Sequence, residues 1–260
     1  MVKVAFKSPG GRRAFAFAPG LADFARVDID EWISAAFRTQ QWTGWYCYSD
    51  HAPPRPGFRP PRPPDGQCKG IVLWNATASA WLVHSVPDWP SAMPLEIVPE
   101  THLARAHCFA FWSGGADRLG KIESQVDLMG AKVYLGKRSV LCGVPRVATL
   151  QRVILDDTTD HLAKNKLWDR DLYECMGPCR VQSWMRPVLD DTPVVQNISR
   201  MQFTSRDSGE WTTDDDQGTW AIGDTWMAIG DVNRALTNRG GGVLMIRDAA
   251  LVRAMQNIAS

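Results

Sequence analysis

A strand, an amphipathic helix and a second strand follow one another between His107 and Leu135. The apolar run His107 to Trp112 predicts a strand, and Gly114-Gly115 predicts the turn that ends it. Apolar residues then recur with helical spacing from Ala116 to Met129, and Lys132 to Leu135 predicts the next strand. A helix that joins two strands packs against their sheet, so this order predicts a layered α/β arrangement.

Short strands separated by turns are expected along most of the remaining chain, which contains 17 prolines and 21 glycines. The expected strands are two within Val2 to Phe17, then Gly70 to Asn75, Ala80 to Ser85, Arg180 to Trp184, Asn197 to Phe203, Thr219 to Ile222, Trp226 to Ile229 and Val243 to Ile246. Helices are expected at Ile29 to Phe37 with Asp28 or Asp30 as N-cap, between Asp160 and Glu174, and at Ala249 to Ile258 behind Asp248. Because the pattern restarts after Cys142, two α/β halves are expected.

Charge and cysteine content exclude several classes of protein. The 29 basic and 28 acidic residues give a net charge of +1, which excludes a globally basic surface. No apolar run is long enough to span a membrane, and the first residues do not form a secretory signal. Six dispersed cysteines without a CxxC pair predict free thiols and no zinc site. A cytoplasmic or otherwise intracellular protein without a membrane partner is therefore expected.

His84 is the histidine whose position is most suggestive of chemistry. It lies at the end of the predicted strand Ala80 to Ser85, and Pro87 and Pro90 follow it. Ligand sites in α/β proteins collect at strand ends. A single histidine at such a place is also commonly a structural residue, so both interpretations stay open.

Two glycine-containing motifs could each bind an anion or serve only the local fold. Gly115 to Lys121 matches GxxxxGK, but Ile122 stands where a phosphate-binding loop needs a hydroxyl for magnesium, which favours a solvated helix start. Arg239 to Gly242 is either a tight turn before a strand or a backbone nest for an anion.

Two polar segments are also ambiguous. Asp214 to Asp216 is either a solvated turn or a cation site, and the turn is favoured. Ala52 to Pro64 is too rich in proline for a helix or a sheet interior and is expected to be a surface loop, with a PxxP ligand as the alternative.

A set of motifs in conserved order resembles the deoxyribonuclease II family over nearly the whole chain. The matching segments are Tyr48-Ser49-Asp50, Gly66 to Leu73, Trp81 to Pro87, Arg105 to Cys108, Asp171 to Tyr173, Val181 to Trp184, Asn197 to Phe203, Asp216 to Ala221, Gly230 to Arg234 and Arg239 to Gly242. The resemblance implies a phospholipase D-like fold, in which two α/β halves form a pseudo-dimer around one central cleft. The halves are expected at residues 1–150 and 151–260.

The resemblance also implies hydrolysis of DNA at acidic pH without a metal or another cofactor. Each half of such a protein contributes a His-x-Lys motif. One histidine attacks phosphorus to form a phosphohistidine, and the other protonates the leaving oxygen. The lysines hold the phosphate oxygens and neutralise the charge that develops on them.

This chain departs from the family pattern at both motifs. The first reads Gln67-x-Lys69 and the second reads Gln217-x-Thr219, so both histidines and one lysine are replaced. A glutamine amide cannot form the phosphohistidine or exchange a proton near pH 7, although it still donates hydrogen bonds to a phosphate oxygen. Alanine also stands at two family cysteine positions, Ala221 and Ala228, which fits a reducing compartment.

Three functions follow, and whether the chain is an enzyme stays open among them. The first is a homologue with a degenerate active site that binds DNA or another phosphodiester without cutting it by the family route. Its expected phosphate-binding residues are Gln67, Lys69, Gln217, Thr219, Asn233 and Arg234, with Arg239 beside the groove. The second is an enzyme for a small molecule, with His84 as general acid or base, Lys69 as electrophile and Asp231 as the group that orients the histidine. The third is a metal-independent acid endonuclease that uses His84.

Overall fold

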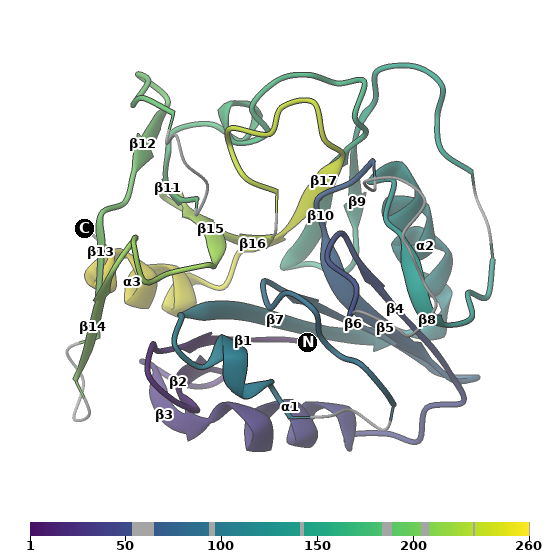
Figure 1. The fold of residues 1–260 in the computed structure, drawn as a ribbon, viewed down its shortest axis with the longest axis horizontal. Coiled ribbons are helices and arrows are strands. Elements are labelled where there is room, and N and C mark those ends of the chain that lie inside the picture. The colour runs from purple at the N-terminus through teal and green to yellow at the C-terminus, as the bar shows by residue number, and fades with distance from the viewer. Residues whose placement is uncertain are drawn as a thin grey trace.

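A computed structural model describes residues 1–53, 65–93, 97–140, 143–183, 189–203, 208–230 and 232–259. Most of the proline-rich segment, together with Cys142 and Asp231, lies outside these ranges. The described part confirms a mixed α/β chain in which sheets predominate over helices (Figure 1). No helix in it is long and apolar enough to cross a membrane.

The first sheet contains eight strands, all paired antiparallel. They are β1 (Val2–Lys7), β2 (Arg13–Phe17), β3 (Ala25–Asp28), β4 (Gly44–Ser49), β5 (Lys69–Trp74), β6 (Ala78–His84), β7 (His107–Gly115) and β8 (Val133–Gly136). Their order is β3-β2-β1-β7-β6-β5-β4-β8. All of these strands precede residue 137.

The second sheet contains seven strands that begin at residue 150. They are β9 (Leu150–Ile154), β10 (Thr159–Lys164), β11 (Cys179–Gln182), β12 (Val195–Asn197), β15 (Thr219–Ile222), β16 (Met227–Gly230) and β17 (Gly241–Ile246), in the order β12-β11-β15-β16-β17-β10-β9. Only the pair of β11 and β12 is parallel among these described pairs. A separate hairpin joins β13 (Arg200–Phe203) to β14 (Gly209–Thr212).

Three α-helices and three short 3₁₀ helices accompany the sheets in the described ranges. They are α1 (Ile29–Phe37), α2 (Leu119–Leu128), α3 (Ala249–Ile258), η1 (Glu100–His102), η2 (Ala116–Arg118) and η3 (Tyr173–Met176). The side chain of Asp28 starts α1 and that of Asp248 starts α3, because each accepts hydrogen bonds from two backbone N–H groups of the first turn. The helix α2 begins inside the GxxxxGK segment, so that segment is a helix start.

The core lies in layers, because alternate residues of each strand face opposite sides of its sheet. One face of the first sheet packs against α1, which lies below it in Figure 1. The other face shares one apolar cluster with α2, α3 and the second sheet. The side of the second sheet turned away from that cluster is covered by residues that include Leu172 and Tyr173.

The two sheets share one plan over six strands. In the first sheet the run is β4-β5-β6-β7-β1-β2, and in the second it is β11-β15-β16-β17-β10-β9. In each run a hairpin leads to a third strand that continues into a helix, so β5-β6-β7-α2 corresponds to β15-β16-β17-α3. The corresponding strands β6 and β16 pack against each other.

The expected helix between Asp160 and Glu174 is wrong. The first part of the segment belongs to β10, and the 3₁₀ helix η3 begins near its end. Every residue of β10 is buried, so the strand lacks the polar–apolar alternation that marks a strand with one solvated face. Its polar side chains have partners elsewhere in the fold: Asp160 pairs with Arg247, and His161 bonds Gln125. The strands β3, β4, β9 and β14 were not anticipated.

Candidate functional site

Lys69 of the first motif forms a buried ion pair at the start of β5. Its Nζ lies 2.8 Å from Oδ1 of Asp50, and both side chains are almost completely buried. The other oxygen of that carboxylate lies 3.1 Å from Nδ1 of His51, whose side chain is 61% exposed. Burial raises the pKa of Asp50, but the charge of Lys69 and the hydrogen bonds from His51 and Lys69 outweigh burial and lower it. Asp50 therefore stays ionised and holds both the cation and the imidazole.

The second motif holds no cation. Thr219 begins β15, is buried, and donates a hydrogen bond of 3.1 Å from Oγ1 to Oδ1 of Asn233. Gln217 is half-buried, and its Oε1 has no hydrogen-bond partner within the described ranges. A hydroxyl and an amide thus stand where the first motif has an ammonium group and an amide.

Asn233 joins the two motifs. Its backbone N–H donates to Oε1 of Gln67 over 2.8 Å, and its side-chain Oδ1 accepts from Thr219 and, over 3.3 Å, from Ser183. Gln67 and Asn233 are 166 positions apart in the chain. The structure therefore brings Gln67, Thr219 and Asn233 together.

Each motif is also attached to the opposite half of the chain through the backbone. In the first crossing, the Gln67 N–H donates to the carbonyl of Gly240 over 2.7 Å. In the second crossing, the Gln217 N–H donates to the carbonyl of Ala106 over 3.0 Å. Gly240 directly precedes β17 and Ala106 directly precedes β7, which are corresponding strands. The two crossings are therefore equivalent positions of the shared plan.

Close backbone approach at the first crossing requires glycine. A Cβ on Gly66 would lie 2.1 Å from the carbonyl oxygen of Met129, and a Cβ on Gly240 would lie 2.2 Å from the same oxygen. Side chains at these two positions would displace the end of α2. Gly240 of the Arg239 to Gly242 segment thus serves the packing of the crossing.

His84 does not face a site that a substrate could enter. Its side chain is fully buried, with the ring of Trp89 at 4.8 Å and that of Phe109 at 6.4 Å. Burial, reinforced by the nearby charge of Lys69, lowers the pKa of His84 to about 3. The imidazole is neutral and shielded at moderate pH. These surroundings argue against the expected role in general acid–base catalysis.

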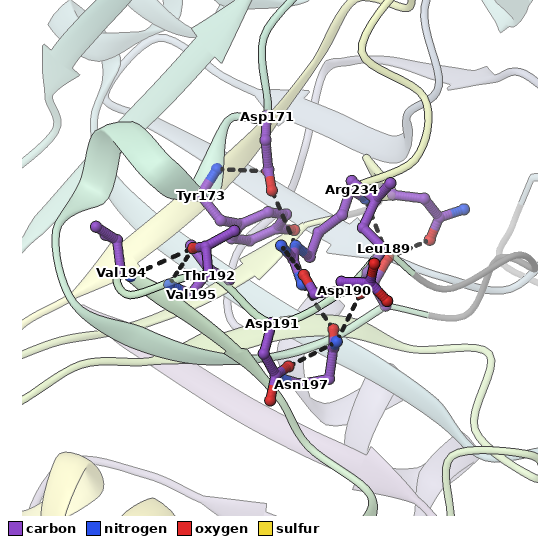
Figure 2. Close-up of polar contacts among 12 residues, drawn as sticks. Asp171, Tyr173, Leu189, Asp190, Asp191, Thr192, Val194, Val195, Asn197 and Arg234 are labelled. Atoms are coloured by element: carbon purple, nitrogen blue, oxygen red, sulfur yellow. Dashed lines mark hydrogen bonds and ion pairs between the residues drawn. The ribbon is translucent and has the colours of Figure 1, made fainter.

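Arg234 is a structural centre of the second half (Figure 2). Its buried guanidinium donates from Nε to Asp171 over 2.9 Å, from Nη1 to Asn197 over 2.7 Å, and from Nη2 to the carbonyl of Asp190 over 3.3 Å. Its backbone N–H donates to Ser183. Because its nitrogens are used in this way, we exclude Arg234 from the candidate phosphate ligands. Asp231 lies outside the described residues.

Asp216 is buried, although a solvated turn was expected. Its Oδ1 accepts the Gly218 N–H over 2.6 Å, and its Oδ2 accepts the indole N–H groups of Trp211 and Trp220 over 3.2 and 3.5 Å. Burial raises the pKa of Asp216. The tryptophans at either side of the acidic run were the available signal, because an indole N–H needs an acceptor when it is buried.

Several other residues of the site region were not assigned from sequence. Asp50 and Ser183 lie in segments that resemble the family but were given no role, and His51 and the buried Lys7 and Lys164 lie outside those segments. In the described ranges no group of three or more His, Cys, Asp or Glu side chains could hold a metal. A depression of about 270 Å³ between β11, β12 and α3 includes Arg180 but none of the motif residues.

Comparison with known proteins identifies the family of this chain. A sequence model of the family described as Deoxyribonuclease II matches residues 31–260. The chain is 27% identical over 253 residues to "Putative deoxyribonuclease-2" of Burkholderia pseudomallei, a match that covers 82% of this chain and 70% of that protein. It is 22% identical to "Cell-death-related nuclease 7" of Caenorhabditis elegans, covering 80% and 65%, and 21% identical to "Deoxyribonuclease-2-beta" of Mus musculus, covering 74% and 64%. With the family model matching nearly the whole chain, this protein belongs to the deoxyribonuclease II family.

Proposed function

We propose that this family member binds DNA or another phosphodiester where its two motifs meet, without hydrolysis through a phosphohistidine. The observation that carries the proposal is the link through Asn233, which connects Gln67 of the first motif to Thr219 of the second. A phosphate beside this link would meet Lys69 and the amides of Gln67 and Gln217. Ammonium and amide N–H groups are suitable donors to phosphate oxygens.

The residues at the two motifs are unsuited to hydrolysis through a phosphohistidine. Glutamine occupies both positions where the resemblance implies histidine, and an amide neither attacks phosphorus nor carries a proton to the leaving oxygen. Oε1 of Gln67 is already used by the Asn233 N–H. The motif positions thus retain hydrogen-bond donors and have lost the nucleophile and the acid.

A pseudo-dimer of phospholipase D-like halves, residues 1–150 and 151–260, is part of the proposal. Its support is the shared strand order of the two sheets and the equivalence of the two crossings.

We also propose an intracellular, reducing location. The five described cysteines, Cys47, Cys68, Cys108, Cys175 and Cys179, are all free thiols.

Binding of a fluorescent DNA duplex in EDTA, followed by anisotropy between 50 and 200 mM salt, tests the proposal. Replacement of Lys69 by methionine should weaken binding about tenfold and reduce the slope of log affinity against log salt by about one, because one phosphate contact is lost. The matched control is Lys121→Met, since Lys121 donates to the carbonyl of Ile154, away from both motifs. Absence of DNA binding, or equal binding by both variants, would contradict the proposal.

A second candidate function is a metal-independent hydrolase with a rebuilt catalytic group. It is favoured by the exposed imidazole of His51, which Asp50 holds beside Lys69. A carboxylate beside Nδ1 orients an imidazole, and an oriented imidazole can act as a base toward water. Nicking of supercoiled plasmid in EDTA between pH 4.5 and 7.5 that is lost in His51→Gln, and retained in His84→Gln, would establish this candidate. No nicking at any of these pH values excludes it.

A further inference from the structure

Two buried lysines occupy corresponding places in the two halves. Lys7 is the last residue of β1 and pairs in register with His107, the first residue of β7. Lys164 is the last residue of β10 and pairs with Gly241, the first residue of β17. Lys7 is 0% exposed and Lys164 is 1% exposed. Burying an ammonium group is costly unless its protons are bonded, so both positions call for a physical reason.

Both ammonium groups bind backbone carbonyls, and in each case one of these carbonyls lies in the loop that leads to a crossing. Nζ of Lys7 donates to the carbonyls of Ser8, Gly11 and Leu103 over 2.8, 3.0 and 2.9 Å. Nζ of Lys164 donates to the carbonyl of Trp168 over 3.0 Å and to that of Thr237.

The spacing between each bound carbonyl and its crossing is the same in both halves. Leu103 lies three residues before Ala106, which accepts the N–H of Gln217. Thr237 lies three residues before Gly240, which accepts the N–H of Gln67. Each lysine thus holds the loop that receives the motif of the opposite half.

We propose that Lys7 positions Gln217 and that Lys164 positions Gln67, each acting through the loop whose carbonyl it binds. By fixing Leu103, Lys7 fixes the Ala106 carbonyl to which the Gln217 N–H is bonded. By fixing Thr237, Lys164 does the same for the Gly240 carbonyl and Gln67. The inference uses the proposed function only in treating the two motifs as parts of one binding site.

The charged groups around each lysine support a positioning role. Burial lowers the pKa of Lys7 to about 8, with Arg12 lowering it further and Asp216 and Asp30 opposing. Burial also lowers the pKa of Lys164 to about 8, against Asp171, Asp169 and Cys175. Both lysines therefore carry charge at neutral pH and present three donors to carbonyls, which a methionine of similar length cannot do.

Hydrogen exchange at individual backbone amides, followed by NMR at pH 7, tests the crossed relation. In Lys7→Met the protection factor of the Gln217 amide should fall at least tenfold while that of Gln67 is unchanged. In Lys164→Met the Gln67 amide should lose protection and Gln217 should keep it. Lys121→Met, which also removes a lysine bonded to a carbonyl, should change neither amide. Lys7→Arg and Lys164→Arg retain donors and should restore part of the protection.

Two outcomes would overturn the proposal. One is an equal loss of protection at both amides in either methionine variant, which indicates general destabilisation. The other is unchanged protection in both. If a methionine variant does not fold, the arginine variants and Lys7→Gln or Lys164→Gln provide the same crossed comparison. DNA binding measured on the same samples separates the two proposals, because crossed exchange without any DNA binding retains the positioning role and removes the proposed function.

Discussion

The two motifs occupy equivalent places and have different chemistry. The first keeps an ion pair between Lys69 and Asp50, whereas the second has the neutral hydrogen bond between Thr219 and Asn233. Both motifs nevertheless start a strand next to a hairpin, and both are attached to the opposite half by one backbone hydrogen bond. Symmetry of the backbone is thus retained where symmetry of charge has been lost.

The buried carboxylates near the motifs show the same contrast. Asp50 has a cation as partner, and its pKa is lowered despite burial. Asp216 precedes the second motif, the hydrogen bonds described for its carboxylate come from neutral N–H groups, and burial raises its pKa. A neutral partner set therefore does not compensate for desolvation as an ammonium group does.

The largest expected effect is a fall in the free energy of unfolding in acid, and it allows the two halves to be compared through their buried histidines. Burial lowers the pKa of His84 and of His161 to about 3, and it lowers that of His107 well below 6.5. Below pH 6.5 the unfolded chain binds protons that the folded chain refuses, so the unfolding free energy falls as pH falls. Each histidine contributes up to about 1.4 kcal/mol per pH unit in that range. Two of the three lie on the first sheet.

Urea denaturation at pH 7.0, 6.0 and 5.0 measures this dependence. His84→Phe should reduce the slope by about one proton, because it removes one buried group whose pKa is lower in the folded chain than in the unfolded chain. His161→Phe is the matched variant in the second half, and it should also lose stability at pH 7 because His161 bonds Gln125. An unfolding free energy independent of pH over this range would contradict the burial of these histidines.

The next effect compares the ion pairs of the two halves. Arg234→Met should lower the unfolding free energy by about 3–5 kcal/mol, because Asp171 would remain buried without its cation. Lys69→Met should cost less, since His51 still lies beside the Asp50 carboxylate. Chemical denaturation at pH 7 measures both. Arg234→Lys is the control: it keeps the charge, but a single ammonium group cannot reach the three separate partners that the planar guanidinium reaches, so its loss should be intermediate.

A larger loss for Lys69→Met than for Arg234→Met would reverse this comparison. It would mean that His51 does not stabilise the Asp50 carboxylate. In that case the first motif would be the more important electrostatic centre for folding as well as for binding.

Local sequence signals predicted the bounds of those helices that begin with an N-capping aspartate. The helices at Ile29–Phe37 and Ala249–Ile258 have the expected bounds because an aspartate precedes each of them. The strand β10 was mistaken for a helix, since a strand buried on both faces has no alternating pattern to reveal it. Whether such a segment forms a helix or a strand depends on contacts with residues far away in the chain.

The sequence predicts which residues form the candidate site, but it does not predict their burial or their electrostatics. Motif order pointed to Gln67, Lys69, Gln217, Thr219 and Asn233 as one site, and the structure places Asn233 between the two motifs. Burial could not be deduced in the same way. A strand-end histidine looks the same in sequence whether it faces a cleft or packs against Trp89, as His84 does.

The smallest expected effect is a difference in the free energy of unfolding between variants of Gln67 and of Thr219, the two motif residues that Asn233 connects. Gln67→Leu removes the acceptor of a buried backbone N–H and should cost about 1–3 kcal/mol, because that donor is left unpaired. Thr219→Val removes a donor, but Oδ1 of Asn233 still accepts from Ser183, so the cost should be about 0.5–1.5 kcal/mol. Urea denaturation of both variants, with Gln67→Glu as the control that keeps an acceptor, measures the difference. Equal costs would show that Asn233 depends on both motifs alike. A larger cost at Thr219 would make the second motif, although it holds no cation, the one on which the junction depends.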